Sequence, residues 1–189
     1  MSAVAQPLFN QGWYRYARQL PSPNVDDRPA GTVVDLLVIH SISLPPGVYG
    51  GGQIAEFFQN RLDFDAHPYF DGLRALRVSS QFLIARTGAL TQFASAEQRA
   101  WHAGLSSFEG RERCNDFSIG IELEGLEGEP FEPAQYDTLL SVGAALAQAY
   151  PLRAAASHRY IAPSRKADPG AAFDWSVVQR AWPGLRCHA

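Results

Sequence analysis

Two segments of the chain carry the clearest patterns of hydrophobic residues. Residues 33–39 read VVDLLVI, and His40 follows them directly. A nearly continuous apolar run of this kind is typical of a strand that is covered on both faces. Residues 117–123 instead alternate along the chain. One face of that strand would carry Ile119, Ile121 and Leu123, and the other face Gly120, Glu122 and Glu124. The two patterns predict inner strands of a sheet.

Helical spacing of apolar residues predicts four helices. They cover residues 9–20, 54–62, 133–150 and about 174–182. In the first helix, Trp13, Tyr16, Ala17 and Leu20 would share a face. The Pro21-Ser22-Pro23 segment would end that helix and begin a loop that runs to about residue 32.

Further strands are expected at residues 78–84 and 90–93, joined by a Thr87-Gly88 turn as a hairpin. A short segment, 154–157, leads into His158. Strands and helices are thus interleaved, and at least one hairpin is present. The pattern predicts an α/β (mixed α+β) fold with a central mixed sheet flanked by helices. We expect one domain over residues 1–189, with its core at about 33–182 and the helix and loop at about 9–32 in front of it.

Charge and composition exclude several classes of protein. The formal net charge is -3 and no basic stripe is visible, which argues against a nucleic-acid partner, although Arg111 and Arg113 could form a local anion site. The two cysteines, Cys114 and Cys187, suit neither a disulfide framework nor a CxxC zinc site, so we expect free thiols. No signal-peptide pattern and no membrane-length apolar run is seen. We therefore expect a cytoplasmic protein with no membrane partner.

Three residues could form a zinc site. His40 follows the best strand, and His158 and Asp168 belong to one loop segment. Two histidines and one carboxylate are a known ligand set of zinc hydrolases, with a fourth position open for water. A lone histidine at a strand end is more often a hydrogen-bonded structural residue, and the spacing alone leaves both interpretations open.

Other polar residues could complete such a site. Glu122 could take a proton from a zinc-activated water, and the neighbouring Gly120 would leave room for a substrate. Glu124, on the same strand face, is its direct competitor. Lys166 could stabilise an oxyanion, although a loop lysine is more often solvated. Arginines 77, 111 and 113 are candidates for carboxylate binding. Trp101 could form the wall of a sugar cleft or simply pack.

Longer motifs give a more specific signal. The sequence closely resembles the AmpD family, the cytoplasmic 1,6-anhydro-N-acetylmuramyl-L-alanine amidases of bacteria, within the zinc amidase and peptidoglycan-recognition superfamily. The resemblance follows nearly the whole chain in order. Its main stretches are Val38-Ile39-His40, Ala66-His-Pro-Tyr-Phe70, Arg99-Ala-Trp-His-Ala-Gly104, Gly110 through Gly125, and His158 through Gly170.

The resemblance implies roles for individual residues. It implies one Zn²⁺ held by His40, His158 and Asp168, with Glu122 activating water and Lys166 supporting the transition state. It also implies that Arg77 and Arg113 hold carboxylates of the stem peptide. Ser41 departs from the family, which has asparagine there, so its substrate contact is in question. The three remaining histidines would be structural or peripheral, with His102 at the border of the cleft.

The function implied is hydrolysis of the amide between N-acetylmuramic acid and L-alanine in muropeptides. Such an enzyme acts in peptidoglycan recycling and, in some bacteria, affects β-lactamase induction. We expect a monomer whose partner is the small muropeptide. Two alternatives are a peptidoglycan-recognition module without catalysis and an amidase that acts on intact cell wall. The intact ligand set disfavours the first, and the short chain without a signal peptide disfavours the second.

Overall fold

The fold is built on one sheet of seven strands. A computed structural model describes residues 7–189, so the first six positions of the expected domain lie outside the described residues. The strand order is β13–β12–β5–β11–β6–β7–β3. All neighbours pair in parallel except β6 and β7, which form the predicted hairpin. These strands are β3 (Arg18–Gln19), β5 (Leu36–Ile42), β6 (Phe82–Ile84), β7 (Leu90–Gln92), β11 (Ser118–Glu124), β12 (Ala154–Ser157) and β13 (Arg186–His188). The predicted mixed sheet is confirmed.

Three small ribbons and several helices surround this sheet. The ribbons pair β1 (Phe9–Asn10) with β2 (Trp13–Tyr14), β4 (Val25–Asp26) with β8 (Arg99–Ala100), and β9 (Ser107–Phe108) with β10 (Arg111–Glu112). The α-helices are α1 (Gln53–Phe58), α2 (Pro133–Ala149), α3 (His158–Ile161) and α4 (Trp175–Ala181). Three 3₁₀ turns are η1 (Phe64–Ala66), η2 (Pro68–Leu73) and η3 (Cys114–Asp116). None of the helices in residues 7–189 combines the length and apolar character needed to cross a membrane.

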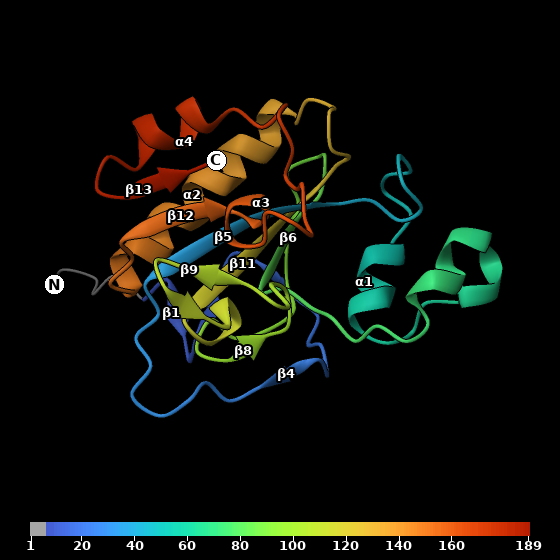
Figure 1. Cartoon of the computed structure of the whole chain (residues 1–189), viewed down its shortest axis with the longest axis horizontal. Coiled ribbons are helices and arrows are strands. Elements are labelled where there is room, and N and C mark those ends of the chain that lie inside the picture. The colour runs from blue at the N-terminus through green and yellow to red at the C-terminus, as the bar shows by residue number, and fades with distance from the viewer. Residues whose placement is uncertain (1–6) are drawn as a thin grey trace, which may run out of the picture.

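The two faces of the sheet pack against different layers. Leu37 and Ile39 of β5 point toward α2 and α4, and the alternating face of β11 that was predicted to be apolar joins them in the same core. Leu36 and Val38 point the other way, toward the ribbon and turn region near Phe108. Helices α2 and α4, the helical layer, lie on the opposite side of the strands from the β9–β10 ribbon, which forms the ribbon layer (Figure 1). Since successive side chains alternate along a strand, His40 lies on the ribbon side with Leu36 and Val38.

A third cluster forms a lobe beyond the carboxyl end of β5. There α1, η1 and η2 lie beside the main body (Figure 1). The lobe has its own apolar centre, which includes Ile54, Phe57, Phe58 and Phe70. The predicted helix at 54–62 is therefore present but shorter, and it ends at Phe58.

The predicted N-terminal helix at residues 9–20 is wrong. The segment forms β1, β2 and β3 instead. Gly12 has a φ of +74° in the β1–β2 turn, a conformation that an α-helix does not contain. Tyr14, which lies off the predicted face, is the buried residue, while Tyr16 on that face is 66% exposed. The spacing matched a helix by coincidence, because aromatic residues also suit short strands.

The inner strands match their predictions with shifted ends. β5 starts at Leu36, because Val33 is exposed, and it continues two residues past His40. β6 covers only the end of the expected segment 78–84. The sheet also extends beyond the expected core, since β3 and β13 form its edges. Cys114 and Cys187 are free thiols, as expected.

The contact between α2 and α4 depends on a glycine. A Cβ atom at Gly143 would lie 1.8 Å from Cζ2 of Trp182, and Trp182 is buried at the end of α4. Alanine usually stabilises a helix relative to glycine by about 1 kcal/mol, but overpacking a core costs about 1–3 kcal/mol. The close approach therefore favours glycine at this position.

We expect Gly143→Ala to lower the free energy of unfolding in urea by up to about 2 kcal/mol, because the added methyl displaces the Trp182 ring at a cost that exceeds the gain in helix propensity. Ala144→Gly, at the exposed neighbouring position, calibrates the helix propensity alone. A Gly143→Ala protein more stable than wild type would contradict this account of the α2–α4 contact.

Candidate metal centre

Three parallel strands bring the candidate residues to one edge of the sheet. His40 on β5 is in register with Glu122 on β11. Ser157, the last residue of β12, is in register with Ile39, so His158 follows beside His40. Carboxyl ends of parallel strands meet at the same edge, where ligand sites of α/β proteins commonly lie. A backbone hydrogen bond of 3.0 Å from Arg159 N to Asp168 O holds the Asp168 loop against the same edge.

Three candidate ligand atoms converge at this edge. His40 Nδ1 lies 2.9 Å from His158 Nδ1 and 3.0 Å from Asp168 Oδ2, and His158 Nδ1 lies 3.1 Å from the same oxygen. All three residues are buried. Adjacent ligands of a tetrahedral zinc ion with 2.0–2.1 Å bonds are about 3.3 Å apart. The spacing is therefore close to one face of a zinc coordination tetrahedron.

The outer nitrogens of both histidines have separate partners. His40 Nε2 lies 3.0 Å from His102 Nδ1, and His158 Nε2 lies 3.1 Å from the carbonyl oxygen of Ala103. With these partners engaged, both Nδ1 atoms are available as lone-pair donors toward a cation. Neutral imidazoles and a carboxylate suit Zn²⁺, so the residues present fit the ion.

Burial sets the protonation preferences of these groups. It lowers the pKa of His40 to about 4, with the nearby His158 as a second cause. Burial alone would raise the pKa of Asp168, but hydrogen bonds with His158 and His40 outweigh it, and the pKa lies below its usual value. Near neutral pH, the site therefore presents a neutral His40 and an ionised carboxylate, which are the forms that bind metals.

Glu122, and not Glu124, faces this centre. Glu124 accepts hydrogen bonds from the backbone nitrogens of Gly50 (2.6 Å) and Arg86 (3.1 Å), so it holds two loops together. Glu122 Oε2 is buried and has no hydrogen-bond partner among residues 7–189. Burial raises the pKa of Glu122 well above its usual value, and the negative Asp168 adds to this shift while Lys166 opposes it. An unpaired carboxyl beside the ligand set is suited to proton transfer.

A cavity of about 680 Å³ opens onto these residues. Ser41 and Lys166 line it together with the three ligands and Glu122, so the structure brings six of the predicted site residues together. One part of its wall is apolar and comes from the lobe and the loop after β5. These apolar residues are Leu44, Pro46, Phe57, Tyr69, Leu73 and Leu76.

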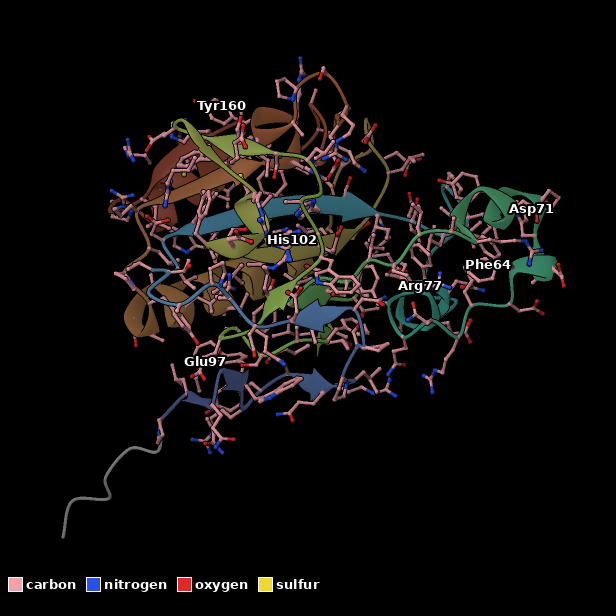
Figure 2. All side chains as sticks on the ribbon, turned by 60° about the horizontal axis from the view of Figure 1, so that its bottom comes forward. Phe64, Asp71, Arg77, Glu97, His102 and Tyr160 are labelled. Carbon is pink, nitrogen blue, oxygen red and sulfur yellow. The ribbon has the colours of Figure 1, made fainter. Side chains whose placement is uncertain are left out.

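The other three candidates lie outside this lining. Arg77 is in the lobe, where its guanidinium donates to the carbonyls of Arg74 (2.9 Å) and Leu76 (2.8 Å) (Figure 2). The Arg113 side chain is 68% exposed and lies 3.4 Å from Asp116. Trp101 is half-buried and bonds to Ser79 through its backbone. Arg111, the remaining anion candidate, pairs with buried Asp35 at 3.0 Å. Substrate contacts of Arg77, Arg113 and Trp101 stay predictions.

His102 has a larger role at this site than the sequence indicated. It borders the cavity, as expected, and its ring also contacts His40. Burial lowers the pKa of His102 well below its usual value, and nearby His40 adds to this. A Cβ at Gly120 would lie 2.6 Å from Cγ of this ring. The interpretation that Gly120 leaves room for substrate is therefore wrong, because the His102 ring fills that room.

Comparison with known proteins agrees with this geometry. Residues 30–171 match the model of the family described as N-acetylmuramoyl-L-alanine amidase. The chain belongs to this family. The 1,6-anhydro-N-acetylmuramyl-L-alanine amidase AmpD of Citrobacter freundii is 51% identical over 171 residues, which are 89% of this chain and 91% of that protein. The predicted family resemblance is confirmed.

Solved structures of related amidases share the fold. A crystal structure of a selenomethionine AmpD derivative superposes with a TM-score of 0.88 and 48% identity, covering 92% of this chain and 98% of that one. A complex of the Escherichia coli amidase AmiD with the substrate anhydro-N-acetylmuramic acid-L-Ala-D-γ-Glu-L-Lys is 28% identical, with a TM-score of 0.59. It covers 82% of this chain and 60% of that chain. The predicted fold class is confirmed.

The buried carboxyl of Glu122 should make stability depend on pH. Its pKa in the folded protein lies above the unfolded value of about 4.3, so the folded state retains a proton that the unfolded chain releases as the pH rises. The contribution of this carboxyl to stability therefore falls above about pH 4. Replacing it with a neutral amide removes this effect.

We expect metal-free Glu122→Gln to be more stable than metal-free wild type at pH 7, with the difference shrinking toward pH 4. Urea unfolding in the presence of a chelator measures both proteins across this range. Glu97→Gln, on the surface, is the matched control and should change stability little (Figure 2). An equal gain for Glu122→Gln at pH 4 and pH 7 would contradict the buried-carboxyl account.

Proposed function

We propose that this protein is a zinc-dependent hydrolase of the amide bond between 1,6-anhydro-N-acetylmuramic acid and L-alanine in muropeptides. The observation that carries the proposal is the convergence of three ligand atoms beside the unpaired carboxyl of Glu122, inside one open cavity. AmpD relatives about half identical to this chain over nearly their full length carry the same activity in their names.

His40, His158 and Asp168 would hold the ion. When bound, zinc supplies Lewis acidity that polarises a carbonyl and lowers the pKa of water toward neutrality. Both histidines would bind through Nδ1, since their Nε2 atoms already have partners in the protein. The open side of this ligand set faces the cavity that Glu122 also lines.

Glu122 moves the proton in this mechanism. Its carboxylate accepts a proton from the attacking water, which adds to the lactyl carbonyl carbon of muramic acid. The Lys166 ammonium, at the cavity wall, stabilises the negative charge that develops on the carbonyl oxygen. Glu122 then gives its proton to the L-alanine nitrogen as the carbon–nitrogen bond breaks. The products are the muramic carboxylate and the free stem peptide.

Substrate contacts follow from the shape of the cavity. Its mixed wall suits a substrate that combines a sugar with a charged peptide. Ser41 lines the cavity and would contact the substrate near His40. We propose that Arg77, Arg113 and Trp101 contact parts of the substrate that extend beyond the cavity. For Arg77, this would require its guanidinium to leave the carbonyls that it now bonds.

The setting of the reaction is part of the same proposal. A soluble anhydromuropeptide is a product of wall turnover, so its cleavage belongs to peptidoglycan recycling. We propose that the enzyme acts in the cytoplasm as a monomer and, where β-lactamase induction responds to uncleaved muropeptide, lowers that signal. The intact ligand set and Glu122 argue against a recognition module without catalysis.

Cleavage of anhydro-N-acetylmuramyl-tripeptide, followed by mass spectrometry, tests the proposal. We expect zinc-loaded wild type to release free tripeptide, chelation to abolish release, and added zinc to restore it. Glu122→Gln should lower kcat by about 10²–10⁴-fold because the proton acceptor is lost, while zinc stoichiometry stays at one. Glu97→Gln is the charge-matched control and should retain wild-type kcat.

The outcomes separate the competing functions. Binding of the tripeptide without cleavage by zinc-loaded wild type would contradict the proposal and favour a recognition module. Cleavage of insoluble sacculi at a rate above that of the soluble substrate would instead indicate an amidase of the intact wall.

A further inference from the structure

One dipeptide, His102-Ala103, contacts both metal-binding histidines. The His102 ring meets His40 Nε2 at 3.0 Å, and the Ala103 carbonyl meets His158 Nε2 at 3.1 Å. Asn115 fixes the backbone of this dipeptide. Its Oδ1 accepts hydrogen bonds from His102 N at 3.1 Å and from Ala103 N at 2.7 Å. His102 lies inside the body of the molecule, over the inner strands (Figure 2). The orientation of both histidine ligands therefore depends on a segment that contributes no ligand.

The direction of each hydrogen bond can be traced from the far end of this network. Ser118 Oγ lies 2.5 Å from the carbonyl oxygen of Cys114, which can only accept, so the Ser118 hydroxyl donates there. The single hydroxyl proton is then used, and Ser118 Oγ can only accept from His102 Nε2, 3.3 Å away. His102 therefore carries its proton on Nε2, and its Nδ1 is an acceptor.

The hydrogen-bond network continues from His102 to the metal site. Because His102 Nδ1 accepts, His40 must donate through Nε2–H. A neutral imidazole with its proton on Nε2 has its lone pair on Nδ1, which faces His158 and Asp168. The Ala103 carbonyl imposes the same tautomer on His158. The network thus points both lone pairs at one position before any ion is bound.

We propose that His102, held by Ser118, is a positioning residue that fixes the tautomer and the ring orientation of His40 for zinc binding through Nδ1. The proposal rests on the zinc site of the proposed function. His102 acts through His40 and does not touch the reacting atoms. Two features show that the position of His102 is fixed by packing. Both Ser118 and His102 are buried, and the absence of a side chain at Gly120 leaves the space that the His102 ring occupies.

The tautomers are directly observable by long-range ¹H–¹⁵N NMR of the imidazole rings in zinc-loaded wild type. We expect protonated Nε2 and unprotonated Nδ1 for His40 and His102 alike. A proton on His102 Nδ1, or zinc bonded to His40 through Nε2, would overturn the proposal. This measurement needs no variant, so it stands even where a substitution impairs folding.

Zinc affinity, measured by competition with a chelator, tests the effect of the network. Loss of a hydrogen-bond partner to a metal ligand typically weakens binding about 10–100-fold, and we expect this for His102→Leu, which removes the acceptor. His102→Asn keeps an acceptor oxygen near the Nδ1 position and should recover most of the affinity. Ser118→Ala, which releases His102 to take either tautomer, should fall between wild type and His102→Leu. His188→Asn, in β13 at the sheet edge, is the control and should bind zinc as wild type does.

The results distinguish this inference from the proposed function. Wild type that binds no zinc at the three ligands would overturn the proposed function itself. Tight zinc binding by both wild type and folded His102→Leu would overturn the positioning role alone. Equal losses in His102→Leu and His102→Asn would show that packing, and not the hydrogen bond, matters, and would also overturn it. Circular dichroism of each metal-free variant confirms that it is folded.

Discussion

The parallel register of β5, β11 and β12 is the constraint on which the site depends. It places Glu122 opposite His40 and sets His158 beside His40. Strand pairing alone therefore brings together three residues that are far apart in sequence. The backbone hydrogen bonds of this pairing fix the positions, and side-chain alternation fixes the face. A slip of one residue in β5 would turn His40 into the helical layer and bring Ile39 to the ribbon side. The apolar cores on the two faces, which demand Leu37 and Ile39 on one side and Leu36 and Val38 on the other, oppose such a slip.

Burial at this edge creates a second requirement. Polar groups removed from water must be paired, because each unpaired group is costly. The structure meets this for the outer nitrogens of both histidines through His102 and Ala103, and for Glu124 through two backbone nitrogens. At this end of the strands, the two Nδ1 lone pairs and Glu122 Oε2 lack such partners and face the cavity. These three atoms are therefore placed where an ion and a substrate can use them.

Much of the fold could be predicted from the sequence, because burial on two faces leaves a strong local pattern. The strands at β5 and β11, the β6–β7 hairpin and the long helix α2 were all expected, although their ends shifted. The N-terminal strands β1, β2 and β3 could not be predicted from spacing, since Gly12 turns the chain and short strands leave no regular period. The prediction of the three ligands rested mainly on the family resemblance, because spacing alone does not show that His40 and Asp168 lie close together. The contact between His102 and His40 joins residues 62 positions apart, and nothing local to either one indicates it.

Zinc-edge anomalous diffraction from crystals of the zinc-loaded protein would test the central claim most directly. The account predicts a single anomalous peak bonded to Nδ1 of His40, Nδ1 of His158 and a carboxylate oxygen of Asp168, with its open position facing Glu122. A peak at any other group of residues, or bonding through the Nε2 atoms, would contradict it. Either of those results would mean that the buried network around His102 and Ala103 does not orient these histidines for a metal ion.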